Sequence, residues 1–148
     1  MASSVKQVLD HKGHNFHSVG PSDSVFAALG LMAEHNTGCV LVMDGEALVG
    51  IFTERDYARK VVLKGLSSTN VLVGELMTSN PVTVGLSTTV DEVMSMMTER
   101  RFRHMPVLED GKVVGIVTIG DMVKSIVSDQ KSTISQLQSY IAGDFSNN

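Results

Sequence analysis

Two short segments of the sequence place a threonine three residues before an aspartate. Thr53 precedes Asp56, and Thr118 precedes Asp121, with this same spacing. A threonine followed three residues later by an acidic residue is typical of a helix start, where both side chains bond to free backbone N–H groups. A carboxylate is also a strong acceptor for hydroxyl groups, and a helix N-terminus attracts phosphate. The two segments therefore predict helix caps, ligand contacts, or both at once.

Both segments occupy the same position in an internal repeat. Residues 50–56 (GIFTERD) recur as residues 115–121 (GIVTIGD), at an offset of 65 residues that continues upstream without a gap. Matching pairs include Val25 with Val90. A fixed period of this kind indicates two homologous halves. Because both halves keep the threonine and the aspartate, ligand contact is favoured over capping alone.

Each half predicts the elements that would position these residues, in the order β-α-β-β-α. An extended piece comes first, at residues 17–19 and 81–84, and a helix follows a polar turn. Two strands then flank an Asp-Gly turn, at residues 44–45 and at residues 110–111. A second helix is expected at residues 54–63 and 119–127. The predicted fold class is α+β, with a shared core, because a half of about 60 residues is marginally stable alone.

The segments outside the two halves predict short amphipathic helices, near residues 5–9 and 134–141, that cover exposed edges. The expected division of the chain is an N-terminal helical segment at 1–12, a first repeat at 13–66, a second repeat at 71–128, and a C-terminal helix and tail at 129–148.

The bulk properties argue against several classes of protein. Of the 148 residues 43% are hydrophobic and the net charge is −4, which indicates a globular chain and disfavours nucleic-acid binding through a basic surface. No apolar run is long enough to span a membrane, and the N-terminus lacks the apolar stretch of a signal peptide. We therefore expect a cytoplasmic protein without membrane contact. The single cysteine, Cys39, is interpreted as a core side chain rather than a redox group.

The sequence does not predict a catalytic or metal centre. We find no nucleophile beside an obvious base and no glycine-rich phosphate loop, so enzymatic activity is not expected. His11, His14 and His17 lack the spacing of a tetrahedral metal set. Neither a catalytic cofactor nor a bound metal is predicted.

The duplicated pattern Gly-Ile-x-Thr-x-x-Asp after a hairpin, together with the segment RHMPV at residues 103–107, resembles paired CBS domains. The resemblance covers nearly the whole chain and is closest to stand-alone bacterial CBS domain proteins. It implies a pseudo-twofold pair, or Bateman module, that binds an adenosine-containing ligand such as AMP, ADP, ATP, NAD or S-adenosylmethionine in two related clefts. It further implies a regulatory, signal-transducing role, a homodimer, and an effector protein of unknown identity that is a separate molecule.

The resemblance assigns ligand-binding residues to each cleft by position in the motif. One cleft would contain Ile51, Thr53, Arg55, Asp56, Val82, Thr83, Arg103, His104, Met105 and Pro106. The other would contain His17, Ser18, Gly38, Cys39, Val40, Ile116, Thr118 and Asp121. The two aspartates would accept hydrogen bonds from ribose hydroxyls. Arg59, one helical turn after Arg55, adds a second cation for a polyphosphate.

Two alternatives stay open. Arg103 and His104 are explained equally well as solvated residues at the start of a strand, and their counterparts Gly38 and Cys39 carry no charge, so the two clefts are expected to differ. The alternative function is a dimerising scaffold or docking module whose clefts are vestigial. It would act through its methionine-rich helices and its end segments.

Overall fold

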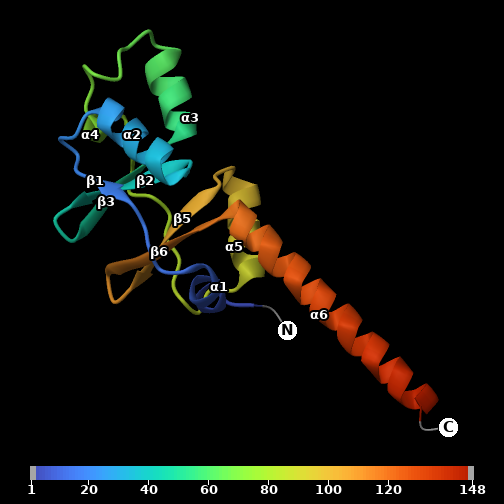
Figure 1. Ribbon diagram of the computed structural model, residues 1–148. Helices are drawn as coiled ribbons and strands as arrows, with labels where there is room; N and C mark the ends of the chain where they lie inside the picture. Colours follow the sequence, from blue (N-terminus) through green and yellow to red (C-terminus); the bar gives the residue numbers. More distant parts are fainter. Residues whose placement is uncertain (1–2, 147–148) are drawn as a thin grey trace.

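The computed structural model of the protein describes residues 3–146, apart from the side chains of residues 140 and 142–146 (Figure 1). Along the chain its elements are α1 (Val5–Lys12), β1 (Ser18–Val19), α2 (Val25–His35), β2 (Cys39–Asp44), β3 (Ala47–Thr53), α3 (Glu54–Tyr57), a π-helical turn η1 (Ala58–Val62), α4 (Val73–Leu76), β4 (Thr78–Ser79), α5 (Val90–Arg100), β5 (His104–Glu109), β6 (Lys112–Thr118) and α6 (Ile119–Ser146).

The two halves contribute two sheets, which confirms the predicted α+β class. The first sheet has the strand order β1-β2-β3-β4, with β1 parallel to β2 and the other pairs antiparallel. The second sheet consists of the antiparallel pair β5-β6. The extended piece predicted at residues 81–84 makes only one isolated parallel bridge, from Val84 to Val107. That bridge is the equivalent of the Val19 to Val42 pair in the first half.

Both predicted hairpins form, with two-residue turns at equivalent positions of the repeat, but the Asp-Gly pair occupies the turn only in the second. In the second hairpin Asp110 and Gly111 occupy the turn, both with positive φ, as a two-residue type I′ turn requires. In the first hairpin Asp44 instead pairs with Ala47, so the turn consists of residues 45–46. Only Gly45 there takes a positive φ, of 62°. The prediction of an Asp-Gly turn is therefore wrong for the first hairpin, where the strand extends one residue further.

Polar side chains start the long helix of each half. The Ser24 hydroxyl accepts a hydrogen bond from the Ala27 N–H at 3.0 Å, and the Thr89 hydroxyl accepts one from the Glu92 N–H at 3.1 Å. These bonds satisfy donors that the first helical turn leaves free. The predicted helix at residues 54–63 forms as α3 followed by η1, where the Leu63 N–H donates to the Ala58 carbonyl at 3.0 Å.

Among the residues that the structure describes, three clusters of buried apolar side chains hold the fold together. One lies in the first half around Phe52, and one in the second half around Met105. The third joins the two sheets, because Leu41 and Ile51 of the first half pack with Ile116 of the second. The halves therefore share buried surface, as their small size requires.

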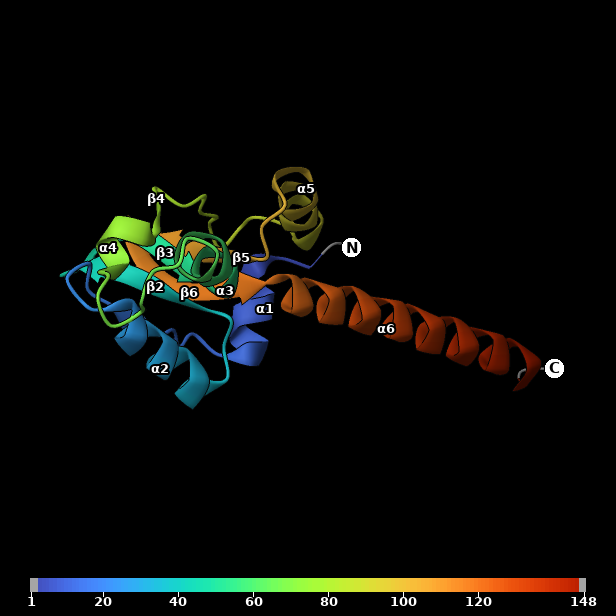
Figure 2. The same ribbon diagram turned by 90° about the horizontal axis from the view of Figure 1, so that it is seen from above.

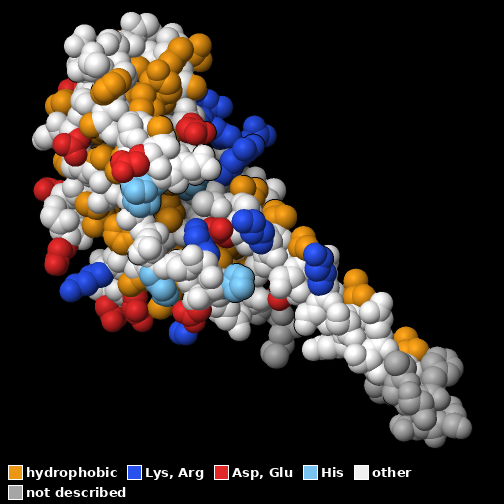
Figure 3. Space-filling model, in the orientation of Figure 1, with side chains coloured by type: hydrophobic (Ala, Val, Ile, Leu, Met, Phe, Trp, Pro, Cys, Tyr) orange, Lys and Arg blue, Asp and Glu red, His pale blue; other side chains and the backbone are white. Residues whose placement is uncertain are grey.

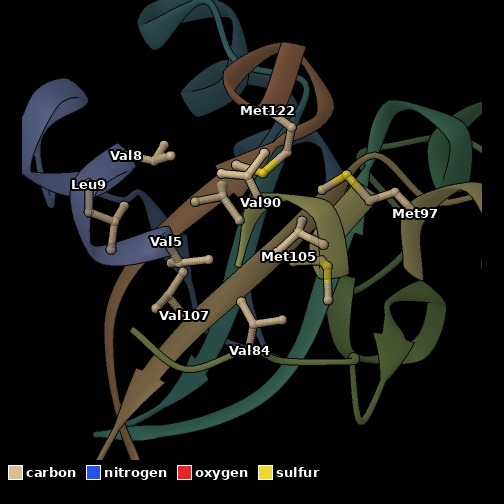
Figure 4. Packing of buried hydrophobic residues seen from close by; sticks show 11 residues of the cluster. Val5, Val8, Leu9, Val84, Val90, Met97, Met105, Val107 and Met122 are labelled. Carbon is tan, nitrogen blue, oxygen red and sulfur yellow. The ribbon is translucent and has the colours of Figure 1, made fainter. Parts of the chain in front are cut away.

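Helix α1 belongs to the core of the second half, although it begins the chain. Its side chains Val5, Val8 and Leu9 are buried with Met105 and Met122 (Figure 4). Leu9 lies so close to β6 that a Cβ atom on Gly115 would come within 2.9 Å of its Cδ2 atom. The predicted N-terminal helix thus forms and extends to Lys12, but it packs into the core of the second half rather than covering an exposed edge.

Helix α6 is a single helix of 28 residues, where the sequence predicted two separate helices at 119–127 and 134–141. Nothing in the intervening residues stops a helix, since they contain neither proline nor glycine. The second part projects away from the body of the molecule (Figures 1 and 2). Ile134 and Leu137 are 55% and 57% exposed, so the prediction that this segment covers an edge is wrong. Within residues 3–146 no helix is both long and apolar enough to cross a membrane.

Candidate functional site

A cavity of about 470 Å³ opens where the two halves meet. The first half contributes the end of β3, α3 and η1, and the second half contributes the segments just before and after α5. The lining residues are Gly38, Ile51, Thr53, Glu54, Arg55, Asp56, Arg59, Lys60, Thr78, Asn80, Pro81, Val82, Arg101, Phe102, Arg103 and His104. The volume lies within the range of small-molecule sites.

Asp56 is the one buried charged side chain in the described part of the chain, with 8% of its surface exposed. Its Oδ2 atom accepts hydrogen bonds from the Thr53 N–H at 3.1 Å and from the Thr53 hydroxyl at 3.2 Å. In return, the Asp56 N–H donates to the Thr53 hydroxyl at 3.1 Å. The predicted capping box is therefore present at the start of α3.

The second oxygen of Asp56 faces cationic and polar groups. Its Oδ1 atom lies 3.1 Å from the Lys60 ammonium, one helical turn along the chain, and 3.2 Å from the Thr78 hydroxyl. Lys60 and Thr78 were not among the predicted residues. The i,i+4 spacing of Asp56 and Lys60 was a usable signal for the first. Thr78 lies in the linker between the halves, where no local pattern marks it.

Cations dominate the rim of this cavity. Arg55, Arg59, Lys60, Arg101 and Arg103 all line it, against the carboxylates of Glu54 and Asp56. The Arg55 guanidinium donates to the carbonyl of Arg101 at 2.7 Å and so connects α3 to the end of α5. Lys and Arg side chains gather beside α3, above α5, in the space-filling view (Figure 3). Such a rim attracts anionic groups.

His104 faces the same cavity and comes within reach of Gly38. A Cβ atom on Gly38 would lie 3.3 Å from the His104 Nε2 atom. Burial lowers the pKa of His104, an effect that the nearby Glu54 carboxylate partly offsets. Burial thus favours the neutral imidazole, which can both donate and accept a hydrogen bond.

Seven of the ten residues assigned to the first cleft line this cavity, and three do not. Ile51, Thr53, Arg55, Asp56, Val82, Arg103 and His104 are brought together there. Thr83 lies outside the lining, and Met105 and Pro106 are buried, with Met105 in the core of the second half.

The second set of predicted residues is not gathered around one cavity. Gly38 lines the first cavity instead, and the Cys39 and Val40 side chains are buried in core clusters. The His17 ring stacks on His35, with ring centroids 3.6 Å apart, and Ser18 is exposed on β1. Burial also raises the pKa of the Cys39 thiol to about 12, which agrees with its interpretation as a core side chain.

Thr118 and Asp121 repeat the capping geometry of the first half. The Thr118 N–H donates to the Asp121 carboxylate at 2.9 Å, and the Asp121 N–H donates to the Thr118 hydroxyl at 3.2 Å. The same carboxylate pairs with the Lys12 ammonium at 2.6 Å. Lys12 also donates to the carbonyl of Ile116 at 3.0 Å. This lysine was not predicted, because no sequence pattern relates the end of α1 to β6.

A different hollow lies beside Asp121. A groove of about 560 Å³ runs between α1 and α6, and both Lys12 and Asp121 line it. Ile116, Thr118, His17 and Ser18 are not part of its lining. Among residues whose side chains are described, no cluster of three or more His, Cys, Asp or Glu could hold a metal ion.

Known proteins match this chain along most of its length. The family model for the CBS domain matches residues 5–63 and 73–128. A solved structure with CBS domains from Burkholderia ambifaria is 46% identical, with a TM-score of 0.83 over 86% of this chain and 96% of the other. The CBS domain pair of a protein called MJ0100, solved with 5′-methylthioadenosine and S-adenosyl-L-methionine, is 27% identical, with a TM-score of 0.77 over 87% and 99% of the two chains.

A curated relative is longer than this chain. The mitochondrial CBS domain-containing protein CBSX3 of Arabidopsis thaliana is 39% identical over 128 residues, which is 83% of this chain and 62% of the relative. The chain thus spans less than two thirds of that protein. A cytoplasmic location and the four-part division of the chain stay predictions. The two matched segments coincide with the two halves of the internal repeat, so the chain belongs to the CBS domain family and carries two CBS domains.

Proposed function

We propose that this CBS domain pair senses an adenosine-containing nucleotide in the cavity around Asp56 and passes the change to a partner protein. AMP, ADP, ATP and NAD are the candidate ligands. The main support is one cavity, lined by both repeats, that combines a buried carboxylate, an apolar wall and a cationic rim.

Each part of a nucleotide has a complementary surface in this cavity. Ile51, Val82 and Phe102 supply an apolar wall for the adenine ring. Asp56 is an acceptor for ribose hydroxyls, which would take over the contacts that Thr78 and Lys60 make now. Arg55, Arg59 and Arg103 suit the phosphates.

The relative solved with two adenosyl ligands supports the class of ligand. Its ligands carry no phosphate, whereas the cavity of this chain has at least four arginines on its lining. We therefore favour a ligand with phosphates over S-adenosylmethionine.

Thermal unfolding with AMP, ATP, NAD and S-adenosylmethionine tests the proposal. A ligand at 100 times its dissociation constant stabilises the folded state by about 2.7 kcal/mol, so the midpoint should rise for the phosphate-bearing ligands. The variants R55Q and R59Q should lose more of the ATP shift than of the AMP shift. K64Q, at an exposed position outside the cavity lining, is the matched control. A midpoint that moves with none of the four ligands would rule the proposal out.

The second candidate function, a dimerising scaffold, is favoured by the exposed apolar stripe of α6. Val123, Val127, Ile134, Leu137 and Ile141 are between 42% and 57% exposed. The residues at 127, 134 and 141 recur every seven positions and are β-branched, with Leu137 between two of them. β-branched residues at one core position and leucine at the other favour a two-stranded coiled coil.

We propose that the same helix of a second copy of the chain covers this stripe. Fully burying one such side chain contributes about 1.5–3 kcal/mol. Burying the exposed half of five from each chain gives on the order of 10 kcal/mol, comparable with the roughly 4–15 kcal/mol that association costs. A homodimer of modest affinity is the expected result, and it is compatible with nucleotide sensing.

A further inference from the structure

The segments that lead into the two repeats are structurally equivalent. In one, the Val5 N–H donates to the Thr88 carbonyl at 2.8 Å, and in the other the Val73 N–H donates to the Asp23 carbonyl at 2.9 Å. Leu9 then packs over Gly115, as Met77 packs over Gly50. Helix α1 therefore packs against the second sheet in the same way as α4 packs against the first.

Helix α1 is longer than α4 by about one turn. Val5 and Leu9 correspond to Val73 and Met77 at a separation of 68 residues, whereas the Thr-x-x-Asp segments are separated by 65. Three additional residues therefore lie between Leu9 and the first repeat. Helix α1 spans Val5–Lys12, against Val73–Leu76 for α4.

Lys12 lies at the end of this additional turn and reaches the counterpart of the first cleft. Its ammonium donates to the Asp121 carboxylate at 2.6 Å and to the Ile116 carbonyl at 3.0 Å. In the first half the chain after α4 brings Thr78 to the equivalent carboxylate, with its hydroxyl 3.2 Å from Asp56. The segment after the lead-in helix thus brings a neutral hydroxyl to the first aspartate and a cation to the second, while the cation at the first aspartate, Lys60, comes from η1.

Lys12 contacts the counterparts of two residues that line the first cavity. Ile51 and Asp56 both line the first cavity, and their counterparts Ile116 and Asp121 are bridged by Lys12. The Lys12 and Asp121 side chains are only 30% and 15% exposed. His14 lies on the same edge of β6, with its Nδ1 atom 3.1 Å from the Val114 carbonyl, and so fastens the segment after Lys12.

We infer that Lys12 closes the second cleft, and that this cleft takes a nucleotide only when Lys12 is removed or displaced. The inference rests on the proposed function, since it concerns the twin of the nucleotide cavity. Lys60 makes a charge-assisted contact with Asp56 too, but its other partner is the Leu76 carbonyl, and Ile51 still lines the open cavity. Lys12 bonds instead to the carbonyl of Ile116, the counterpart of Ile51, and Ile116 and Thr118 line neither of the two hollows. One chain therefore binds one nucleotide, at the cleft around Asp56.

Isothermal titration of the full chain with AMP and with ATP tests the inference. Wild type should bind one nucleotide per chain, and D56N should abolish that binding. K12M and K12Q should each bind two, and adding D121N to either should return the count to one. K12R keeps the cation and should remain at one. K6M removes another cation of the same helix, the one that pairs with Asp10, and is the matched control.

Different results would contradict the inference about Lys12 and the proposed function. If wild type binds two nucleotides, or if K12M and K12Q still bind one at the Asp56 site, Lys12 does not close the second cleft. If D56N leaves binding unchanged, or no chain binds either nucleotide, the proposed function fails and this inference falls with it. Circular dichroism of K12M and K12Q, with the wild-type spectrum expected, separates a closed cleft from a misfolded one.

Discussion

At the scale of single residues, Thr53 and Asp56 serve both as a helix cap and as part of the cavity lining. The sequence spacing predicted the cap, and the structure contains it with both reciprocal hydrogen bonds. The sequence left capping and ligand contact open as separate or combined roles, and a proposed ligand contact would use a different oxygen from the cap. Thr53 donates to the Oδ2 atom of Asp56. The Oδ1 atom of Asp56 therefore faces Lys60 and Thr78.

The cap should contribute to stability without any ligand. Replacing Thr53 by alanine removes the acceptor for the Asp56 N–H and should lower the free energy of unfolding by about 1 kcal/mol. Urea unfolding measures this change. T98A, at an exposed position within α5, should differ from wild type by less than half of that amount. An equal loss in both variants would contradict the capping role.

His104 should make stability depend on pH. Its pKa is lowered in the folded state, mainly by burial, so the unfolded chain binds more protons than the folded chain near pH 6. The stability that neutral His104 contributes is present above its unfolded pKa of about 6.5 and is lost as the pH falls toward its folded pKa. Urea midpoints at pH 7.5 and 5.5 should therefore differ less in H104Q than in wild type.

The control for that experiment is H11Q, at an exposed position of α1. It should keep the wild-type difference between the two pH values. If H104Q keeps the full difference as well, His104 is not the group responsible.

Cys39 should be unreactive in the folded protein. Burial raises the pKa of its thiol to about 12, and only the thiolate attacks thiol reagents. Iodoacetamide at pH 8 should label the unfolded chain at least tenfold faster than the native one. Labelling at similar rates in both states would mean that Cys39 is accessible to reagent.

Among the helices and strands, the sequence predicted those whose signal lies within one segment. The repeat predicted the strands and helices of each half because apolar periodicity and capping residues are local. It missed α4, β4 and the full length of α1, whose positions depend on packing against Gly50 and Gly115 of distant strands. The π-helical turn η1 likewise carries no local signal that separates it from an α-helix.

The close approach of the linker to β3 can be tested by adding a methyl group. A Cβ atom on Gly50 would lie 2.9 Å from the backbone carbonyl oxygen of Thr78, which cannot rotate away. G50A should therefore lower the free energy of unfolding by about 1–3 kcal/mol. Gly30, within α2, has nothing within 4 Å of a built Cβ atom, so G30A should stabilise by about 0.5–1 kcal/mol. Thermal melts of the two variants should shift in opposite directions.

At the scale of the whole molecule, the two halves repeat one fold but differ in their lead-in segments. The sequence predicted unequal clefts from Arg103 and His104 against Gly38 and Cys39. In the structure Gly38 lies in the same cavity as His104, and the difference that we infer between the clefts rests instead on Lys12 beside Asp121. No sequence pattern links residue 12 to residue 121, because only the packing of α1 on the second sheet brings them together.

The projecting part of α6 should mediate self-association. Ile134 and Leu137 are more than half exposed, so a second copy of this helix is the expected cover. I134D and L137D place charges in that seam and should weaken a dimer at least tenfold in analytical ultracentrifugation. Q136D, also exposed but on the opposite face of the helix, is the control. Sedimentation of wild type as a monomer at all concentrations would contradict this interface.

We propose that Asp56, and not Asp121, marks the open nucleotide cleft. Isothermal titration of ATP into D56N and D121N compares the two aspartates directly, because asparagine keeps the shape and the helix cap of each. D56N should lose ATP binding, while D121N should bind one ATP per chain with wild-type affinity. Equal losses in the two variants, or a loss in D121N alone, would contradict it.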